Sequence, residues 1–335
     1  MRRAKKRPAA SVAEEITAHG ETEALFKSNF FRLQTAELLR EVAPAYTSPA
    51  LHSLEGSVRQ LRETLLGLPP AHLSWEAGGA GAEPAVSHAH LAGVSPMTSK
   101  VRLSWRPAEK VALTGSYLLR TLARPCLNVD LALYIPGACF HEKDFLDHRY
   151  TDKRLLYLTH LAELLCHQDA SWRSPRLAWL PHAQQVHWPV VELDMPVGGD
   201  TWRVRIIPAL ARGVLAPAKL RPGRANLRQH ACRPGSDAPR ASADYNNAIA
   251  LESTHGDSVE LLHSFYSRDS SGALREASVL LKVWARQRST SQAGSVALEG
   301  HVSLSCCWPM RLGLTVSSVS SVECEIRRAG RRDSS

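Results

Sequence analysis

The chain has 335 residues, of which 44% are hydrophobic and 22% charged, a composition that excludes disorder throughout and predicts about two globular domains. Lysine and arginine total 41 against 32 aspartate and glutamate residues, so the formal net charge is +9, which favours a polyanionic partner such as nucleic acid. No stretch reaches the roughly 18 uninterrupted apolar residues of a membrane span, and the seven cysteines include no C-x-x-C pair, so we expect no membrane partner, no disulfide framework and no zinc knuckle.

Residues 1–20 form a basic tail that opens with the run Arg2–Arg7 and contains no apolar segment of the kind found in a secretory signal. The run fits a nuclear localisation patch or, equally, a solvated disordered tail.

Residues 21–98 predict a helical hairpin followed by a linker. Phe26, Phe30 and Leu33 recur at helical spacing, and Pro44 follows. A second series of leucines runs from Leu51 to Leu68 in alternating steps of three and four. We interpret the pair as a hairpin packed on the main domain, and a partner-binding zipper is the alternative. The Ala- and Gly-rich residues that follow, up to 98, are typical of a linker.

The pattern changes to alternation between 99 and 210, where we expect one domain. Apolar residues at every second position predict strands, and periods of three and four predict the helices between them. The expected strands are 101–105, 111–114, 127–134, 186–195 and 202–207, and the expected helices begin at Tyr117 and span 149–167. Strands and helices in this order predict an α/β (α+β) fold.

Three further segments complete the chain. Residues 211–243 are an arginine-rich loop, 244–292 have helical periodicity and predict the start of a second, helical domain, and 293–335 are expected to be a disordered tail.

The candidate site lies where the strand 111–114 meets Gly115 and Ser116. A Gly-Ser turn at the start of a helix leaves backbone N–H groups and a hydroxyl available to a phosphate. On the following strand, Asn128 and Asp130 share one face, as two metal ligands at i and i+2 would.

This arrangement resembles the nucleotidyltransferase superfamily, in which Gly-Ser holds a triphosphate and carboxylates on two strands hold two magnesium ions. Two such ions require several anionic oxygens. Here Asn128 contributes no charge, and Arg203 and Arg205 occupy the strand where a third carboxylate is expected. We therefore expect no enzyme activity, no metal and no cofactor, with Gly115, Ser116, Asn128 and Asp130 as a degenerate remnant. The alternative is an active metal-dependent nucleotidyltransferase that uses Asp130 with Glu192 or Asp194.

Several longer stretches resemble the nucleolar RNA-associated protein family, also called nucleolar protein 6. They are 111–133, 149–162 and 281–288, supported by shorter matches in 21–42 and 219–228, so that the likeness covers roughly 20–288. The resemblance implies a mixed sheet of poly(A)-polymerase-like type and a nucleolar scaffold in the small-subunit processome. It also implies pre-rRNA or small nucleolar RNA and other processome proteins as partners, and a role in ribosome biogenesis in the nucleus.

Basic residues indicate where RNA would be contacted. The arginine-rich loop offers Arg212, Lys219, Arg221, Arg224 and Arg228, and a smaller patch lies at the start of the helix 149–167, at Arg149, Lys153 and Arg154. A loop this basic is typical of a phosphate-tracking arm, although a merely solvated loop has the same composition. Pro222 and Gly223 oppose regular structure, so we expect ordering only with the partner. The smaller patch opposes the helix dipole, which indicates either an anionic ligand or an acidic neighbour.

Overall fold

The computed structural model describes residues 29–76, 100–168, 170–179, 188–228, 231 and 237–291. The predicted tails 1–20 and 293–335 and most of the predicted linker lie outside these residues. The chain divides into two compact units, Met1–Pro44 and Ala45–Ser335. In the first unit, the helix α2 (Asn29–Val42) has no buried residue, and Phe30 and Leu33 are exposed. The pairing of α2 with the next helix in a hairpin stays a prediction.

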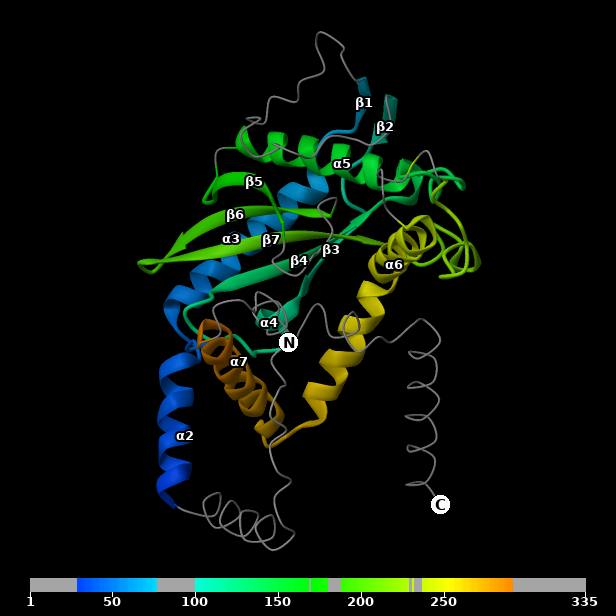
Figure 1. The fold of residues 1–335 in the computed structure, drawn as a ribbon. Helices are drawn as coiled ribbons and strands as arrows, with labels where there is room; N and C mark the ends of the chain where they lie inside the picture. The colour runs from blue at the N-terminus through cyan, green and yellow to red at the C-terminus, as the bar shows by residue number, and fades with distance from the viewer. Residues whose placement is uncertain are drawn as a thin grey trace, which may run out of the picture. The chain divides into compact units, whose positions relative to one another are not determined.

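The second unit is built on a five-stranded mixed sheet in the order β3-β4-β7-β6-β5 (Figure 1). The strands β4 and β7 are parallel and the other neighbours antiparallel. The bounds are β3 (Lys110–Thr114), β4 (Asn128–Ile135), β5 (Arg173–Trp179), β6 (Pro189–Val197) and β7 (Asp200–Leu210). The mixed α/β class predicted from the sequence is confirmed.

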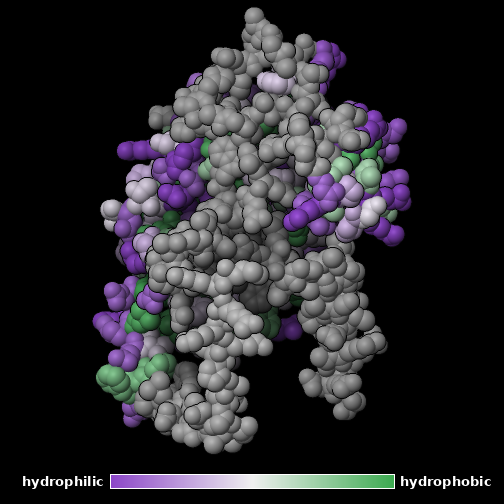
Figure 2. All heavy atoms as spheres, in the orientation of Figure 1, coloured by the Kyte–Doolittle hydropathy of each residue, from purple (hydrophilic) through white to green (hydrophobic). Residues whose placement is uncertain are grey.

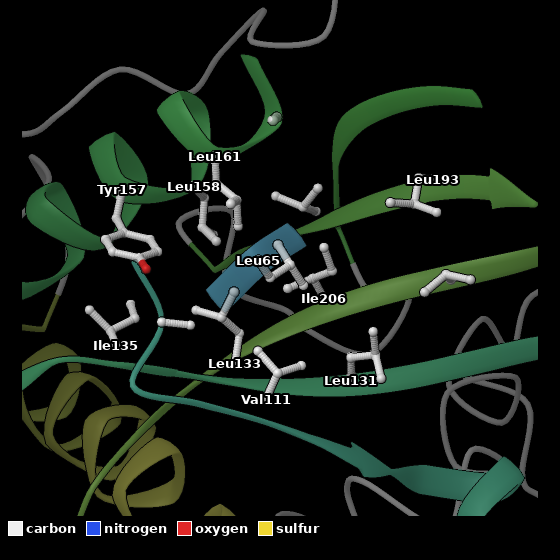
Figure 3. Close-up of a cluster of buried hydrophobic side chains, with 14 of the residues drawn as sticks. Leu65, Val111, Leu131, Leu133, Ile135, Tyr157, Leu158, Leu161, Leu193 and Ile206 are labelled. Carbon is white, nitrogen blue, oxygen red and sulfur yellow. The ribbon is translucent and has the colours of Figure 1, made fainter. Parts of the chain in front are cut away.

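One face of the sheet carries the hydrophobic core, which α3 (Pro49–Gly67) and α5 (Arg149–Cys166) cover (Figure 3). The helix α3 begins after Ser48, whose hydroxyl accepts a hydrogen bond from the Leu51 amide, and its leucine stripe is buried. Helix leucines meet the alternate apolar residues of the strands, among them Leu54, Leu61, Leu65, Leu158, Leu161, Leu131, Leu133, Val204 and Ile206. Burial of this apolar surface is the main favourable contribution to folding.

The remaining helices lie on the opposite side of the sheet from α5 (Figure 1). They are the single turn α4 (Gly115–Leu118), the long helix α6 (Ala238–Arg268) and α7 (Ala273–Ser291). The helix α6 begins six residues before the position 244 expected from the sequence, with Pro239 in its first turn. Within the described residues, no helix combines the length and apolar character that crossing a bilayer requires.

Two strands were not predicted. The strand β1 (Ala71–Glu76) pairs antiparallel with β2 (Lys100–Trp105) in a separate two-stranded sheet, in which Ala71 is the register partner of Trp105 and Glu76 that of Lys100. The strand β5 contains Pro175 and pairs irregularly with β6 at the edge of the main sheet. Proline is tolerated on edge strands because one side of the backbone needs no ladder hydrogen bonds, so the sequence pattern is weak there.

The contribution of a buried β4 side chain to the free energy of unfolding can be measured by comparison with an exposed side chain on β3. Leu131 and Leu113 are register partners, but Leu131 is 1% exposed and Leu113 is 37% exposed. Leu131→Ala is expected to lower the free energy of unfolding by about 2–5 kcal/mol, because it leaves a cavity in packed surroundings. Leu113→Ala is the control and should cost clearly less in the same urea titration. Equal losses would contradict this placement of the core.

Candidate functional site

The face of the sheet opposite α5 carries a row of charged side chains that runs across four strands. Asp130 on β4 pairs in register with Arg205 on β7, Arg205 pairs with Glu192 on β6, and Glu192 pairs with Arg176 on β5. Arg203 and Asp194 stand two residues away on β7 and β6 and face the same way. We call these six residues, Asp130, Arg176, Glu192, Asp194, Arg203 and Arg205, the charge row. Acidic and basic groups alternate along it.

Asp130 is fully buried and is held by two neighbours. Arg205 Nε donates to Asp130 Oδ1 at 2.6 Å, and Asn128 Nδ2 lies 3.1 Å from both carboxylate oxygens. Asn128, at the position where an active enzyme is expected to have its first carboxylate, therefore acts as a hydrogen-bond donor. A guanidinium and an amide occupy the oxygens that a magnesium ion would need.

The other two carboxylates of the charge row are bound by arginines as well. Arg176 Nη2 lies 2.6 Å from Glu192 Oε1, and Arg176 Nη1 lies 2.9 Å from Asp194 Oδ2. Arg203 Nε reaches the same Glu192 oxygen at 3.4 Å. The hydrogen bond that Arg176 donates to Asp194 is the main cause that raises the pKa of Arg176, and Glu192 adds to it. Glu192 and Asp194 thus share the face of Asp130, with the two β7 arginines between them.

Other residues of the chain contact both members of the Gly-Ser turn. Gly115 has a φ of +74°, and a Cβ there would lie 2.4 Å from Asp130 Oδ2, so only glycine fits. The hydroxyl of the buried Ser116 accepts a hydrogen bond from Lys282 Nζ of α7 at 2.8 Å, and the same ammonium contacts the carbonyl and hydroxyl of Thr121. The helix that follows is one turn long, so its dipole adds little positive potential at the Gly-Ser turn.

His255 of α6 also contacts this region. Its Nε2 lies 3.2 Å from the hydroxyl of Thr114, the residue before the Gly-Ser turn. Burial lowers the pKa of His255, and the charge of Asp130 partly opposes that effect. A neutral imidazole at this position adds no charge to the charge row.

Six of the predicted RNA-contacting residues have exposed side chains: Arg149, Arg212, Lys219, Arg221, Arg224 and Arg228. Two of them form ion pairs. Arg212 Nε lies 2.6 Å from Asp257 Oδ2, and Arg228 Nε lies 3.5 Å from Asp147 Oδ2. Because the arginine side chains are 75% and 61% exposed, these pairs hold them only weakly. In the orientation shared by Figures 1 and 2, hydrophilic side chains gather on the side where α5 begins and α6 starts.

The structure places the other two predicted residues, Lys153 and Arg154, inside the fold. Lys153 Nζ lies 2.6 Å from Asp144 Oδ2, and Arg154 lies 2.8 Å from Glu252 Oε1 and stacks over Trp188. Burial raises the pKa of Glu252, against the opposing effect of Arg154. Asp144 and Glu252 are therefore the acidic neighbours that the dipole argument left open. Both basic side chains are buried, so they are not exposed to a partner on the surface.

Three residues of this region were not recognised in the sequence: Arg176, His255 and Lys282. Arg176 stands on β5, whose strand pattern is weak. His255 and Lys282 contact Thr114 and Ser116, which are 141 and 166 residues away in the chain, so no local pattern predicts these contacts. Among the described residues, no group of three or more His, Cys, Asp and Glu side chains is placed to hold a metal ion.

Comparison with known proteins gives consistent matches. The family described as Nrap protein domain 1 matches residues 84–268. Nucleolar protein 6 of Mus musculus is 33% identical over 285 residues, which cover 82% of this chain and 23% of that protein. Nucleolar protein 6 of Homo sapiens is 32% identical and that of Xenopus tropicalis 30%, each with 82% of this chain and 24% of the relative covered. The chain thus spans about a quarter of the length of these curated relatives.

The contact between Asp130 and Arg205 can be tested by a double-mutant cycle. Asp130→Asn removes the carboxylate that the guanidinium contacts, and Arg205→Gln leaves a fully buried carboxylate without that guanidinium, so each is expected to cost about 3–5 kcal/mol. The double variant carries neither charge, and its loss should be about 1–3 kcal/mol smaller than the sum of the two. Chemical unfolding measures all three. Asp257→Asn, at the exposed pair with Arg212, is the control and should cost at most about 1 kcal/mol. Strict additivity at Asp130 and Arg205 would contradict a coupled buried pair.

Proposed function

The chain belongs to the Nrap family, and we propose that it acts as a non-catalytic scaffold in nucleolar pre-ribosomal particles. Its role would be in small-subunit rRNA processing and ribosome biogenesis, through contacts with RNA and with protein. The relatives named nucleolar protein 6 support the placement in the nucleolus. Pre-rRNA or small nucleolar RNA and other small-subunit processome proteins are the proposed partners.

The charge row carries the non-catalytic part of this proposal. Two-metal catalysis of phosphoryl transfer needs several anionic oxygens around two ions about 3.5–4 Å apart. Each of the three carboxylates available on this face contacts an arginine. Binding of metal would have to break these contacts and bring cations next to guanidinium groups, which is electrostatically unfavourable. The nucleotidyltransferase-like fold is thus retained as architecture.

The RNA-binding part is supported by the exposed basic residues of the loop before α6 and by Arg149 at the start of α5. Lys153 and Arg154 are not included, because both are buried and paired. Arginine suits phosphate recognition, since its planar guanidinium can donate two parallel hydrogen bonds.

Protein contacts are supported by apolar side chains exposed at the far end of α6 and on α7. Leu261 is 47% exposed, Phe265 is 55% exposed and Leu281 is 46% exposed. Exposed aromatic and aliphatic side chains of this size are enriched in surfaces that bind other proteins.

An extension assay tests the absence of catalysis. The chain is incubated with an RNA primer, labelled nucleoside triphosphates and magnesium or manganese, alongside an active poly(A) polymerase as positive control. No incorporation is expected with either metal. Incorporation that Asp130→Asn abolishes would show an active enzyme and would overturn the proposal. Asp194→Asn would then report whether that carboxylate completes the site.

Salt dependence of RNA binding tests the basic surface. The logarithm of the affinity should fall linearly with the logarithm of the salt concentration, with a slope of about 0.7–0.9 for each phosphate neutralised. Arg221→Ala and Arg224→Ala should each reduce the slope by about that amount, as measured by fluorescence anisotropy. Arg59→Ala removes an exposed arginine of α3 and is the matched control, which should leave the slope unchanged. Affinity that is independent of salt would argue against a phosphate-contacting surface.

A further inference from the structure

In the basic loop before α6, the backbone of residues 219–228 is bound by buried polar side chains. The sequence led us to expect that Pro222 and Gly223 would leave the loop unordered until a partner binds, and the structure corrects this expectation. Asn226, Ser242 and Asn246 are 5%, 1% and 0% exposed, and we call these three residues the clamp. They come from the loop itself and from the first turns of α6. The short 3₁₀ turn η3 (Pro217–Lys219) precedes the segment they hold.

Asn246 binds the loop backbone at two carbonyls. Its Nδ2 donates to the carbonyl of Arg221 at 3.1 Å and to the carbonyl of Arg224 at 2.8 Å. Its Oδ1 accepts from Asn226 Nδ2 at 2.7 Å, and that amide also donates to the carbonyl of Lys219 at 2.7 Å. The carbonyls of three basic residues are thus fixed by two buried amides, while the side chains of these residues are exposed.

Ser242 and Asp147 fix the rest of the segment. Ser242 Oγ accepts from the backbone amides of Asn226 and Leu227 at 2.7 and 3.2 Å and donates to the carbonyl of Arg224 at 3.0 Å. The backbone of Asp147 donates to the carbonyl of Asn226, and its carboxylate accepts from the amide of Arg228 at 3.1 Å. Buried Leu220 and Leu227 anchor the same segment in the core.

Resting on the proposed RNA-binding function, we infer that the clamp makes this loop a preformed platform for the phosphate backbone of double-helical RNA. Asn226, Ser242 and Asn246 are positioning residues that contact no RNA. A loop that is ordered beforehand does not lose backbone freedom when it binds, so its affinity for a fitting partner is higher. Basic side chains on a backbone that is already held favour a partner whose phosphates also stand at regular positions, as in an A-form helix, whereas a single strand must itself become ordered.

The clamp can be weakened without changing any charge. Asn246→Ala and Ser242→Ala each remove hydrogen bonds to the loop backbone. Asn247→Ala, at the adjacent position on α6, is the matched control for the first, and Ser242→Thr, which retains the hydroxyl, is the conservative control for the second. All variants are made in the full chain and are compared at a temperature at which circular dichroism shows each to be folded.

Binding is measured against an RNA duplex and a single strand with the same number of phosphates. The wild type is expected to bind the duplex more tightly. Each alanine variant of the clamp should lose about tenfold in duplex affinity, equivalent to about 1.4 kcal/mol, with its salt slope unchanged. The loss for the single strand should be smaller. Asn247→Ala and Ser242→Thr should bind as the wild type does.

Amide hydrogen exchange gives a second readout that does not depend on RNA. In the free wild-type chain, the amides of Asn226, Leu227 and Arg228 should already be protected, because each donates to a described acceptor. The alanine variants of the clamp should exchange faster at these amides, with protection of the β4 and β7 core unchanged.

Three outcomes would overturn the inference, and they are distinguishable. Clamp variants that bind the duplex as tightly as the wild type would exclude a preformed platform while leaving the proposed RNA-binding function intact. Wild-type chain that binds neither RNA would overturn the proposed RNA-binding function and this inference together. Displacement of the duplex by polyglutamate of equal charge, at equal concentration, would show a general polyanion surface and overturn the assignment to double-helical RNA.

Discussion

The contact between Arg205 and Asp130 is the constraint on which the charged face of the sheet depends. Asp130 is fully buried, and a buried carboxylate is costly unless its charge is compensated and its oxygens are hydrogen-bonded. In a metal-dependent nucleotidyltransferase, divalent ions perform that compensation. Here Arg205, from the parallel neighbouring strand, does so with one positive charge that belongs to the fold itself. The same contact therefore favours the sheet and disfavours metal binding.

The neighbours of this pair extend the same principle. The charge row contains three carboxylates and three arginines, so it is neutral as a whole. Lys282 of α7 occupies the hydroxyl of Ser116, and Arg286 of the same helix donates to the carbonyls of Ala123 and Arg124. Groups that could bind a triphosphate are thus used to fasten α7 to the sheet domain. Gly115 is still required, because of its φ and its approach to Asp130, although no phosphate is needed to explain it.

Much of this fold could be predicted from periodicity, because β2, β3, β4 and β7 alternate clearly and α3 and α5 have apolar stripes. The absence of a carboxylate at Asn128 was also visible in the sequence, and the structure adds that its amide donates to Asp130. The fate of Lys153 and Arg154 could not be predicted. The carboxylate that binds Arg154 lies 98 residues away, at Glu252, and a helix pattern contains no information about a partner at that separation. The order of the loop 219–228 was missed for the same reason, since Asn246 and Ser242 lie on the following helix.

Some basic residues of this chain are buried and paired with carboxylates, and others are exposed with only their carbonyls bound. This difference decides which residues contribute to the surplus of nine positive charges at the surface. Arg154 and Arg205 each contact a carboxylate from a distant part of the chain, and Lys153 contacts Asp144 in the turn before α5, so their charges are neutralised internally. The ion pairs among the described residues do not include Lys219, Arg221 or Arg224, whose carbonyls are bound inward while their side chains face solvent. Buried amides provide the binding there, and an amide adds no countercharge. Residues 219–228 are consequently bound to the fold through their backbone while they keep their positive charge, a combination that a solvated loop of the same composition would not have.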